Sequence, residues 1–354
     1  MPYIEIRNLN YTYSKKTPYE KRALKDINLD IEEGTIVGLV GATGSGKSTL
    51  IQHLNGLIKI QDKKHSSVIV GGMSATDKKT LKKLRFEVGM VFQYPEYQLF
   101  GETVAKDVAF GPKNMKLEAD EIDRRVRRAL EVVGIDYAKF AERSPFDLSG
   151  GEKRRVAIAG VIAMEPKVLV LDEPVAGLDP AGREEILDLI RKLQKEVSPT
   201  VIIVSHNMDD MAVIADRIIA LKDGEIVADG TPKQVFCSRR LIVDAGLDLP
   251  TAARLTDSLI ARGIKLPGDI VTMEELACEL EKLRLKKIAE TNPYDGDTIE
   301  EDGVEGSEYS DEHEEKESFA QESDFEEDNL IEDNSLENEA EEENIQAEGE
   351  DYDV

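Results

Sequence analysis

The sequence of 354 residues contains no tryptophan, only two cysteines and 5% aromatic residues. Cys237 and Cys278 lie far apart and without the spacing of metal ligands, a usage that fits a reducing cytosol. No apolar run reaches the roughly 18 residues of a membrane-spanning helix, so the chain is not expected to span a membrane by itself. The first residues, MPYIEIRNLNYTY, lack the basic and apolar regions of a secretory signal peptide. These absences indicate a cytosolic protein.

The acidity of the chain is concentrated at one end. The formal net charge is −27, but residues 290–354 hold 29 of the 72 acidic residues and a single basic one, Lys316. The remaining 43 acidic and 44 basic residues nearly cancel, so the body offers no basic footprint for nucleic acid. Few apolar residues and no sustained period in 290–354 predict an acidic disordered tail. A solvated extension is the favoured interpretation, and an acidic lure for a basic partner is the alternative.

Two kinds of strand pattern indicate an α/β fold. In DINLDI, residues 26–31, apolar and polar residues alternate, which is typical of an antiparallel sheet with one wet face. The runs IVGLV (36–40), VLVLD (168–172) and VIIVS (201–205) are continuously apolar and predict parallel strands buried on both faces. Helical patterns lie between these strands, over 119–133, 151–164 and 182–197. The alternation of strands and helices predicts a parallel sheet between two helical layers.

The pattern changes near residue 237. Apolar residues recur at helical spacing over 250–263, and a second helix is predicted to begin at Thr272, where Glu275 completes a capping box. We therefore expect a small C-terminal helical appendage over 237–289, followed by the acidic tail, 290–354.

The segment GATGSGKS, Gly41 to Ser48, follows a buried strand and precedes a helix with an apolar face. This strand–loop–helix arrangement is the context of a P-loop, whose glycines allow backbone N–H groups to surround a phosphate chain. Lys47 is expected to reach the β- and γ-phosphates of the nucleotide, and the Ser48 hydroxyl is expected to bind Mg²⁺.

A pair of carboxylates ends the predicted strand in VLVLDEP. Asp172, at the carboxyl end of that strand, is placed to hold Mg²⁺ through water. Glu173 is placed to orient or deprotonate an attacking water. Both residues could instead be solvated charges at a strand end, but the P-loop elsewhere in the chain favours the catalytic interpretation.

The motifs GATGSGKS, Gln93 in MVFQYPE, LSGGEKRR, VLVLDEP, GLDP and VIIVSH occur in the order seen in ATP-binding cassette (ABC) ATPases, which the chain resembles over residues 3–235. The resemblance implies an ABC cassette domain over 3–236 with an N-terminal antiparallel β subdomain and a helical subdomain at about 94–165. It also implies ATP and Mg²⁺ as cofactors and ATP hydrolysis as the activity.

The resemblance gives roles to three further residues. Gln93 matches the glutamine that reaches Mg²⁺ and the attacking water and that couples to the membrane partner. His206 matches the switch histidine that contacts the γ-phosphate. Tyr13 matches the aromatic residue that stacks on adenine, and it is favoured over Tyr11, which lies on the same strand face.

The LSGG motif implies a second phosphate contact. In the family, this serine and these glycines point at the γ-phosphate on the opposite subunit, so Ser149, Gly150 and Gly151 would meet the nucleotide of a partner. Asp179 in GLDP would cross the same interface. Glu152 stands where many relatives carry glutamine, and activity is expected to survive this difference.

The motifs and the resemblance together predict three groups of site residues. The catalytic residues are Glu173, His206 and Gln93, and the metal ligands are Ser48, Gln93 and Asp172. The nucleotide-binding residues are Tyr13, Gly41, Ala42, Thr43, Gly44, Ser45, Gly46, Lys47, Ser48, Thr49, Ser149, Gly150, Gly151 and Asp179.

A finer resemblance is carried by FQYPEYQLFGETVAKDVAFGPKN (92–114), by SPFDLSGGEKRRVAIAGVIAMEP (144–166) and by LPTAARLTDSLIARGIKLP in the appendage. These segments are similar to the second of the two ATPase subunits in energy-coupling factor (ECF) importers of vitamins or transition metals such as cobalt. The resemblance implies a heterodimer with a second ABC ATPase, a transmembrane scaffold, and substrate-binding membrane subunits that are engaged only indirectly. It also implies a peripheral location on the cytoplasmic face of the cell membrane.

Three alternatives remain open from the sequence. The chain could serve another ABC importer as a homodimer. It could be a non-transport ABC protein, although a single uninterrupted cassette argues against the DNA-repair and ribosomal types. A binding module without catalysis would be expected to lack Lys47 or Glu173, and both are present.

Overall fold

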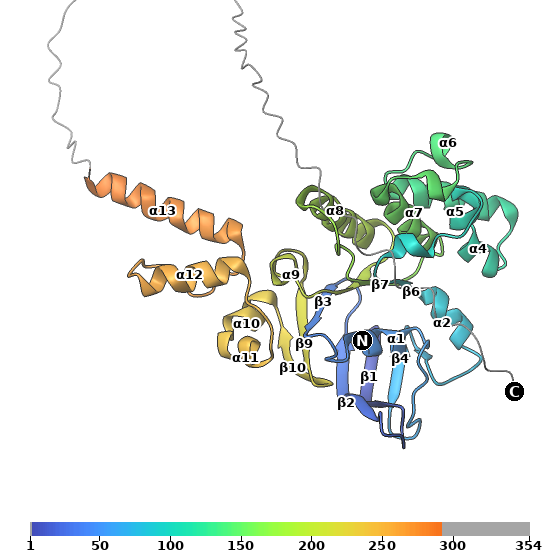
Figure 1. Ribbon diagram of the computed structural model, residues 1–354, viewed down its shortest axis with the longest axis horizontal. Coiled ribbons are helices and arrows are strands. Elements are labelled where there is room, and N and C mark those ends of the chain that lie inside the picture. The colour runs from blue at the N-terminus through green and yellow to red at the C-terminus, as the bar shows by residue number, and fades with distance from the viewer. Residues whose placement is uncertain (1, 292–354) are drawn as a thin grey trace, which may run out of the picture. The chain divides into compact units, whose positions relative to one another are not determined.

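The computed structural model describes residues 2–291 of the chain, and its strands form two sheets (Figure 1). The smaller sheet is antiparallel and has the strand order β2-β1-β4-β5. Its strands are β1 (Ile4–Tyr13), β2 (Lys21–Ile31), β4 (Ser67–Val70) and β5 (Met73–Ser74). The predicted alternation in β2 is confirmed, because Ile27, Leu29 and Ile31 are buried while Asn28 is exposed.

The larger sheet has the order β10-β9-β3-β8-β7-β6, and all its neighbouring strands are parallel except β9 and β10. The strands are β3 (Ile36–Gly41), β6 (Val88–Val91), β7 (Val168–Asp172), β8 (Thr200–Val204), β9 (Arg217–Lys222) and β10 (Glu225–Gly230). The three continuously apolar runs form β3, β7 and β8, as predicted. Because these strands lie between two layers, almost every residue in them is buried.

Alternate residues of the parallel strands face two separate hydrophobic cores. One core lies against the antiparallel sheet and α1 (Lys47–Leu54), and it takes Val37, Leu39, Val168, Val170, Ile202 and Val204. The other core takes Ile36, Val40, Leu169, Leu171, Val201 and Ile203. It is covered by α5 (Ala119–Val132), α7 (Gly150–Ile162), α8 (Pro180–Glu196) and α9 (Met208–Ile214).

A helical region is inserted between β6 and β7 (Figure 1). It contains η1 (Pro95–Gln98), α3 (Val104–Val108), α4 (Phe110–Asn114), α5, α6 (Tyr137–Phe140), η2 (Pro145–Asp147) and α7. The short helix α2 (Leu81–Glu87) leads into β6. This architecture is an ABC cassette fold, with the antiparallel subdomain and the helical subdomain that the sequence predicts.

Up to residue 291, four helices follow β10: α10 (Pro232–Cys237), α11 (Arg239–Asp244), α12 (Thr251–Ala261) and α13 (Met273–Thr291). The capping box predicted at Thr272 is present, because the Thr272 hydroxyl accepts from the Glu275 N–H at 3.2 Å and the Glu275 carboxylate accepts from the Thr272 N–H at 3.4 Å. Helix α13 runs past the predicted boundary at 289. The expected tail, 290–354, thus begins within this helix and from residue 292 on lies outside the described residues, so the domain limits stay a prediction. None of the described helices has the length and apolar character needed to cross a membrane.

Candidate nucleotide site

The loop between β3 and α1 has the backbone of a phosphate cradle. Gly44 and Gly46 have φ angles of 81° and 111°, in the left-handed region that favours glycine. A Cβ on Gly46 would lie 2.5 Å from the carbonyl oxygen of Ala23, so a larger residue cannot stand there. Helix α1 begins at Lys47, and its free N–H groups face the loop.

Side chains of the same loop supply cationic and hydroxyl groups. The Lys47 ammonium donates to the carbonyl oxygens of Gly41 and Ala42 at 2.6 and 3.2 Å. Burial lowers the pKa of Lys47, and the carboxylates of Glu173 and Asp172 oppose this shift. Ser45 is 4% exposed, and its hydroxyl has no partner among the described residues. An unpaired buried hydroxyl inside a loop of N–H groups and a lysine fits a phosphate group.

Two carboxylates lie at the carboxyl end of β7. Burial, followed by the charge of Glu173, raises the pKa of Asp172, while Lys47 and the Ser48 hydroxyl act in the opposite direction. Glu173 has a φ of 50°, a left-handed conformation that is uncommon for a residue with a side chain. Its N–H donates to Val204 on the next strand at 2.9 Å, and this bond holds the unusual turn in place.

Four neighbouring strands bring the expected residues to one edge of the sheet. The P-loop follows β3, His206 follows β8, Asp172 ends β7, and Gln93 follows β6. These strands are adjacent and parallel, so their carboxyl ends meet at the same edge. The Nδ1 atom of His206 lies 2.8 Å from Glu173 Oε1, a contact that joins two of the expected catalytic side chains. Gln93 is exposed at this edge.

Tyr13 lies beside the P-loop helix. Its hydroxyl is 3.1 Å from the hydroxyl of Thr49 on α1, and its ring packs edge-on against Tyr11 at a centroid distance of 4.8 Å. Tyr13 is 39% exposed, whereas Tyr11 is partly buried and packs against the hydrophobic core and against His53. Of the two tyrosines, Tyr13 therefore has the more accessible ring, in agreement with the preference drawn from the sequence.

The signature loop, residues 148–151, begins α7 in the helical subdomain. Ser149 is the N-cap of α7, and its hydroxyl donates to Glu152 Oε2 at 2.8 Å and accepts from the Glu152 N–H at 3.3 Å. The carboxylate of Glu152 also accepts from the Ser149 N–H at 2.8 Å, and these bonds lower the pKa of Glu152. No hydrogen bond or ion pair of the described residues joins the signature loop to the P-loop. The chain thus holds its two glycine-rich loops as separate sites.

Asp179 is the N-cap of α8, where its carboxylate accepts from the Gly182 N–H at 2.7 Å. The same helix carries Arg183, whose guanidinium pairs with the buried carboxylate of Asp210 on α9. Burial raises the pKa of Asp210, and Arg183 opposes this shift. This ion pair therefore connects α8, which follows Glu173 in the chain, to α9, which follows His206.

Arg154 is a residue that the sequence reasoning missed. It is 3% exposed, and its guanidinium pairs with Glu96 at 3.0 Å and donates to the carbonyl oxygens of Pro174 and Ala176. This side chain connects the signature helix α7, the segment after Gln93 and the segment after Glu173. Its helical register with buried Ile158, four residues on, is the pattern that could have indicated an inward-facing arginine.

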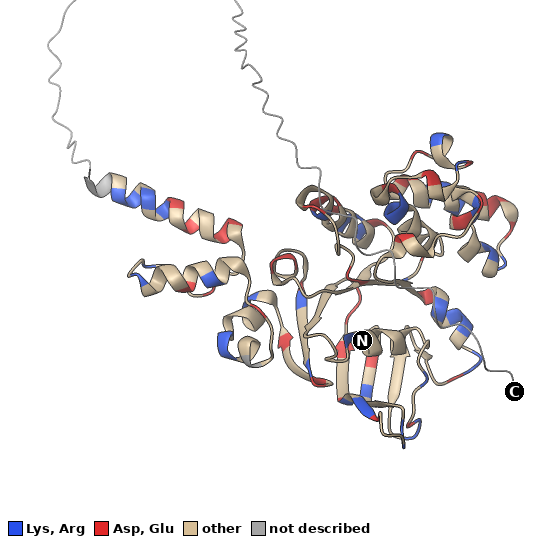
Figure 2. Cartoon of the chain, in the orientation of Figure 1, with Lys and Arg blue, Asp and Glu red and all other residues tan. Residues whose placement is uncertain are grey.

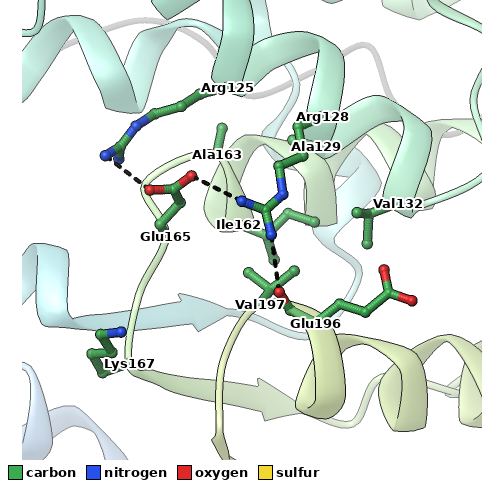
Figure 3. Close-up of a pocket in the computed structure, with 10 residues that line it drawn as sticks. All are labelled: Arg125, Arg128, Ala129, Val132, Ile162, Ala163, Glu165, Lys167, Glu196 and Val197. Carbon is green, nitrogen blue, oxygen red and sulfur yellow. Dashed lines mark hydrogen bonds and ion pairs between the residues drawn. The ribbon is translucent and has the colours of Figure 1, made fainter. Parts of the chain in front are cut away.

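A cavity of about 220 Å³ lies at the opposite edge of the sheet, where Lys167 precedes β7 (Figure 3). Glu165 stands between Arg125 and Arg128 of α5, at 2.9 and 3.6 Å, and Arg128 donates to the carbonyl oxygen of Glu196 at the end of α8. Both arginines are thus already paired with protein groups. This cavity marks a junction between the helical subdomain and the parallel sheet, away from the nucleotide site.

A P-loop, two carboxylates and a histidine on adjacent strand ends, together with a separate glycine-rich signature loop, define an ABC-type ATPase, a protein that binds and hydrolyses ATP. Residues 24–176 match the family described as ABC transporter. The chain is similar to two curated energy-coupling factor transporter ATP-binding proteins EcfA2. Identity is 50% to the one from Clostridium tetani, over 79% of this chain and 96% of that protein. It is 53% to the one from Clostridium perfringens, over 77% and 95%. The chain belongs to this EcfA2 family of energy-coupling factor ATPases.

Solved structures agree with this family. The chain is 41% identical to cbiO1 from Clostridium perfringens, described as part of the ABC transporter complex cbiONQ, with a TM-score of 0.61 over 72% of this chain and 99% of that one. It is 32% identical to the ATP-binding cassette MJ0796, solved as a dimer in a post-hydrolysis state bound to ADP and Pi, with a TM-score of 0.56. That match covers 65% of this chain and 98% of the cassette.

Proposed function

We propose that this chain is the ATP-hydrolysing subunit of an ECF-type importer of vitamins or transition metals such as cobalt. It pairs with a second, related ABC ATPase, and closure of the pair on ATP drives a transmembrane scaffold. The observation that carries this proposal is the identity of about half of all aligned residues to EcfA2 proteins over nearly their full length. The transported molecule is chosen by separate membrane proteins that the scaffold recruits.

At the chain's own nucleotide, Lys47 and the P-loop N–H groups hold the phosphates of ATP. Ser48, Gln93 and, through water, Asp172 would hold Mg²⁺ beside these phosphates. The partly buried carboxylate of Asp172, whose pKa burial raises, would gain a compensating positive charge from a divalent cation. Mg²⁺ when bound neutralises charge on the transferring phosphate.

Glu173 is the group that orients and deprotonates the attacking water. Its carboxylate lies 2.8 Å from the His206 ring, and its backbone is fixed by the bond to Val204. His206 contacts the γ-phosphate and keeps Glu173 in place, so that the state of the phosphate affects the position of the base. Tyr13 stacks on the adenine.

The signature loop serves the nucleotide of the partner subunit. This assignment is supported by its separation from the P-loop, which already receives the chain's own ATP. Ser149, Gly150 and Gly151 present a hydroxyl and N–H groups at a helix N-terminus, and Asp179 lies on the same side of the interface. The catalytic unit is then a head-to-tail dimer with two nucleotides.

An exposed groove of about 270 Å³ between α2, α4 and α7 offers an apolar surface on which helices of the scaffold could bind. The segment that follows Gln93 continues into this groove through Gln98 and Leu99, and Phe86, Phe100 and Phe110 supply aromatic walls. Phe100 and Phe110 are 60% and 51% exposed and pack edge-on against each other. Cytoplasmic helices of a membrane scaffold would bury these rings, and this supports a peripheral location of the chain on the cytoplasmic face of the membrane.

The deciding experiment is an affinity pull-down of the full chain from detergent-solubilised membranes of its own cells, with identification of the co-purifying proteins. We expect a second, distinct ABC ATPase and one small membrane scaffold in equal amounts. Recovery of this chain alone with two copies of a permease would support a homodimeric importer instead. Recovery of no membrane protein would contradict a role in transport.

A further inference from the structure

A cluster of cations covers the outside of α2 and the turn before it. Lys78, Lys79, Lys82, Lys83 and Arg85, here called the α2 cation cluster, are all exposed. In the described part of the chain, none of the five side chains makes an ion pair. Figure 2 shows this helix as a concentration of basic residues next to the helical subdomain. The cluster is unusual because the body of the chain is otherwise close to neutral.

The carboxylates that lie near this cluster in the sequence are engaged elsewhere. Asp77 accepts from the backbone N–H of Lys79 at 2.9 Å, and Glu87 accepts from the hydroxyl of Tyr3 on the first strand. Neither carboxylate forms an ion pair with the cluster, but both keep their negative charge, so residues 77–87 hold five basic and two acidic side chains. Five positive charges less two negative ones leave this surface with a net charge of +3, which can attract an anionic partner.

One face of α2 combines charge with an aromatic ring. Leu84 is fully buried and anchors the inner face of the helix. Lys82 and Phe86 are four residues apart and share the outer face, with the Lys82 ammonium 6.0 Å from the centre of the Phe86 ring. Lys83 lies beside them on the helical surface. Lysine next to an aromatic ring is the combination that membrane–water interfaces favour.

The α2 cation cluster is also continuous with the groove proposed for the scaffold. Phe86 of α2 is one wall of that groove, opposite Phe100 and Phe110. If cytoplasmic helices of the scaffold fill the groove as proposed, α2 would flank them. Its exposed lysines would then be available to the membrane surface around the scaffold.

We propose that the α2 cation cluster binds the anionic headgroups of the membrane around the scaffold. This inference rests on the proposed function, because the scaffold is what brings α2 to the bilayer. Flexible, exposed lysines spread over a helix suit a layer of mobile phosphates better than one small anion, which would need a closed pocket. The contact holds the ATPase on the scaffold while the nucleotide interface opens and closes.

The test is site-resolved acetylation of the full complex reconstituted in vesicles. One vesicle population contains only phosphatidylcholine, and the other contains about one third phosphatidylglycerol. We expect the reactivity of Lys78, Lys79, Lys82 and Lys83, measured by mass spectrometry, to fall about threefold or more in the anionic vesicles. Exposed Lys15 and Lys195, on other elements, serve as internal controls whose reactivity should not change.

If the α2 cation cluster binds the acidic segment 292–354 or the scaffold protein instead of lipid, the acetylation experiment gives different results. Equal reactivity in both vesicle populations would overturn the proposal. Protection that is already complete in neutral vesicles would also overturn it, and a chain ending at Thr291 would then tell two occupants apart. Release of the lysines in the shortened chain would identify the acidic segment 292–354 as the occupant, and unchanged protection would identify the scaffold protein.

A variant pair gives a second readout. Lys82→Glu with Lys83→Glu should speed dissociation of this chain from the scaffold about tenfold or more in anionic vesicles and leave it unchanged in neutral ones. Lys15→Glu with Lys195→Glu makes the same charge change elsewhere and should have no such effect. Failure of the proposed function would appear earlier, as the absence of a scaffold from the pull-down. Failure of the lipid contact leaves an assembled, active complex with unprotected lysines.

Discussion

At the scale of single residues, burial opposes the charged forms of two side chains at the P-loop. Burial lowers the pKa of Lys47 and raises the pKa of Asp172, and each of them partly offsets the effect on the other. The site therefore holds partly desolvated charges whose compensation is incomplete within the protein. In the proposed function, a phosphate would supply the anion that compensates Lys47, and Mg²⁺ would supply the cation that compensates Asp172. Ligand binding should accordingly stabilise the fold.

The substitution Asp172→Asn tests this account through pH. A carboxyl group with a raised pKa in the folded state binds a proton more readily there than in the unfolded chain. Ionisation of Asp172 therefore costs folding stability. This loss is absent below the pKa that the carboxyl has in the unfolded chain, and it develops as pH rises through the pKa that it has in the folded state. At about pH 7, the nucleotide-free variant should thus melt at a higher temperature than the wild type, and the difference should shrink towards about pH 4. Thermal unfolding of both proteins measures this, and a difference that grows on acidification would contradict it.

At the scale of elements, Arg154 is the side chain that joins the parts of the site. The variant Arg154→Met keeps the aliphatic stem but leaves the carboxylate of Glu96 and two carbonyl oxygens without their donor. Breaking a buried pair in this way is expected to lower the free energy of unfolding by about 3–5 kcal/mol. Lys153→Met, one residue away, is the matched control and should change little. Addition of Glu96→Gln to Arg154→Met should recover part of the loss in a denaturant titration, and an unchanged stability of the single variant would refute the linkage.

A second connection joins α9 to the appendage. The N-cap of α12 is Pro250, which makes no side-chain cap bond, and Asp209 of α9 accepts instead from the N–H and hydroxyl of Thr251 at 2.6 and 2.8 Å. Asp209→Ala removes this cap and should destabilise α12 by about 1 kcal/mol. Faster amide hydrogen exchange in the first turn of α12 is the expected observation. Ser258→Ala, on the same helix, should leave that exchange unchanged, and equal effects of both variants would contradict a specific cap.

The sequence predicted those parts of the fold that depend on neighbours along the chain. Continuous apolar runs correctly gave β3, β7 and β8, and the capping box at Thr272 was correctly placed. The partners of Arg154 and Asp209 could not be predicted, because a helical period tells which face a long side chain occupies but not which distant carbonyl or N–H it reaches. The meeting of Gln93, Asp172 and His206 at one edge depends on strand order, and strand order is a property of the packed sheet. The roles of these residues in catalysis stay predictions.

At the scale of the whole molecule, the proposed function gives one cassette half of each composite nucleotide site. If Glu173 is the base, Glu173→Gln removes it and retains the P-loop and signature loop, so ATP should bind without being hydrolysed. With MgATP and its partner ATPase, this variant should form a stable one-to-one dimer of roughly twice the 39.3 kDa mass of the chain, with hydrolysis reduced about 100-fold or more. Size exclusion with light scattering and phosphate release measure the two outcomes.

The same experiment without the partner separates the two importer types. The variant alone with MgATP should remain a monomer if the partner is a different ATPase. A self-associated dimer of this chain alone would favour a homodimeric importer. Rapid phosphate release by Glu173→Gln would show that another group prepares the water.

The hydrogen bond between Ser149 and Glu152 bears on the free energy with which the proposed dimer would close and open. Before the subunits meet, the serine hydroxyl already donates to a carboxylate of its own helix. In the proposed dimer, contact with a partner's phosphate would exchange one anionic acceptor of this hydroxyl for another, and release of phosphate would restore the hydrogen bond to Glu152. Since the hydroxyl would have an acceptor both before and after the subunits meet, this one hydrogen bond would add little net free energy to closure.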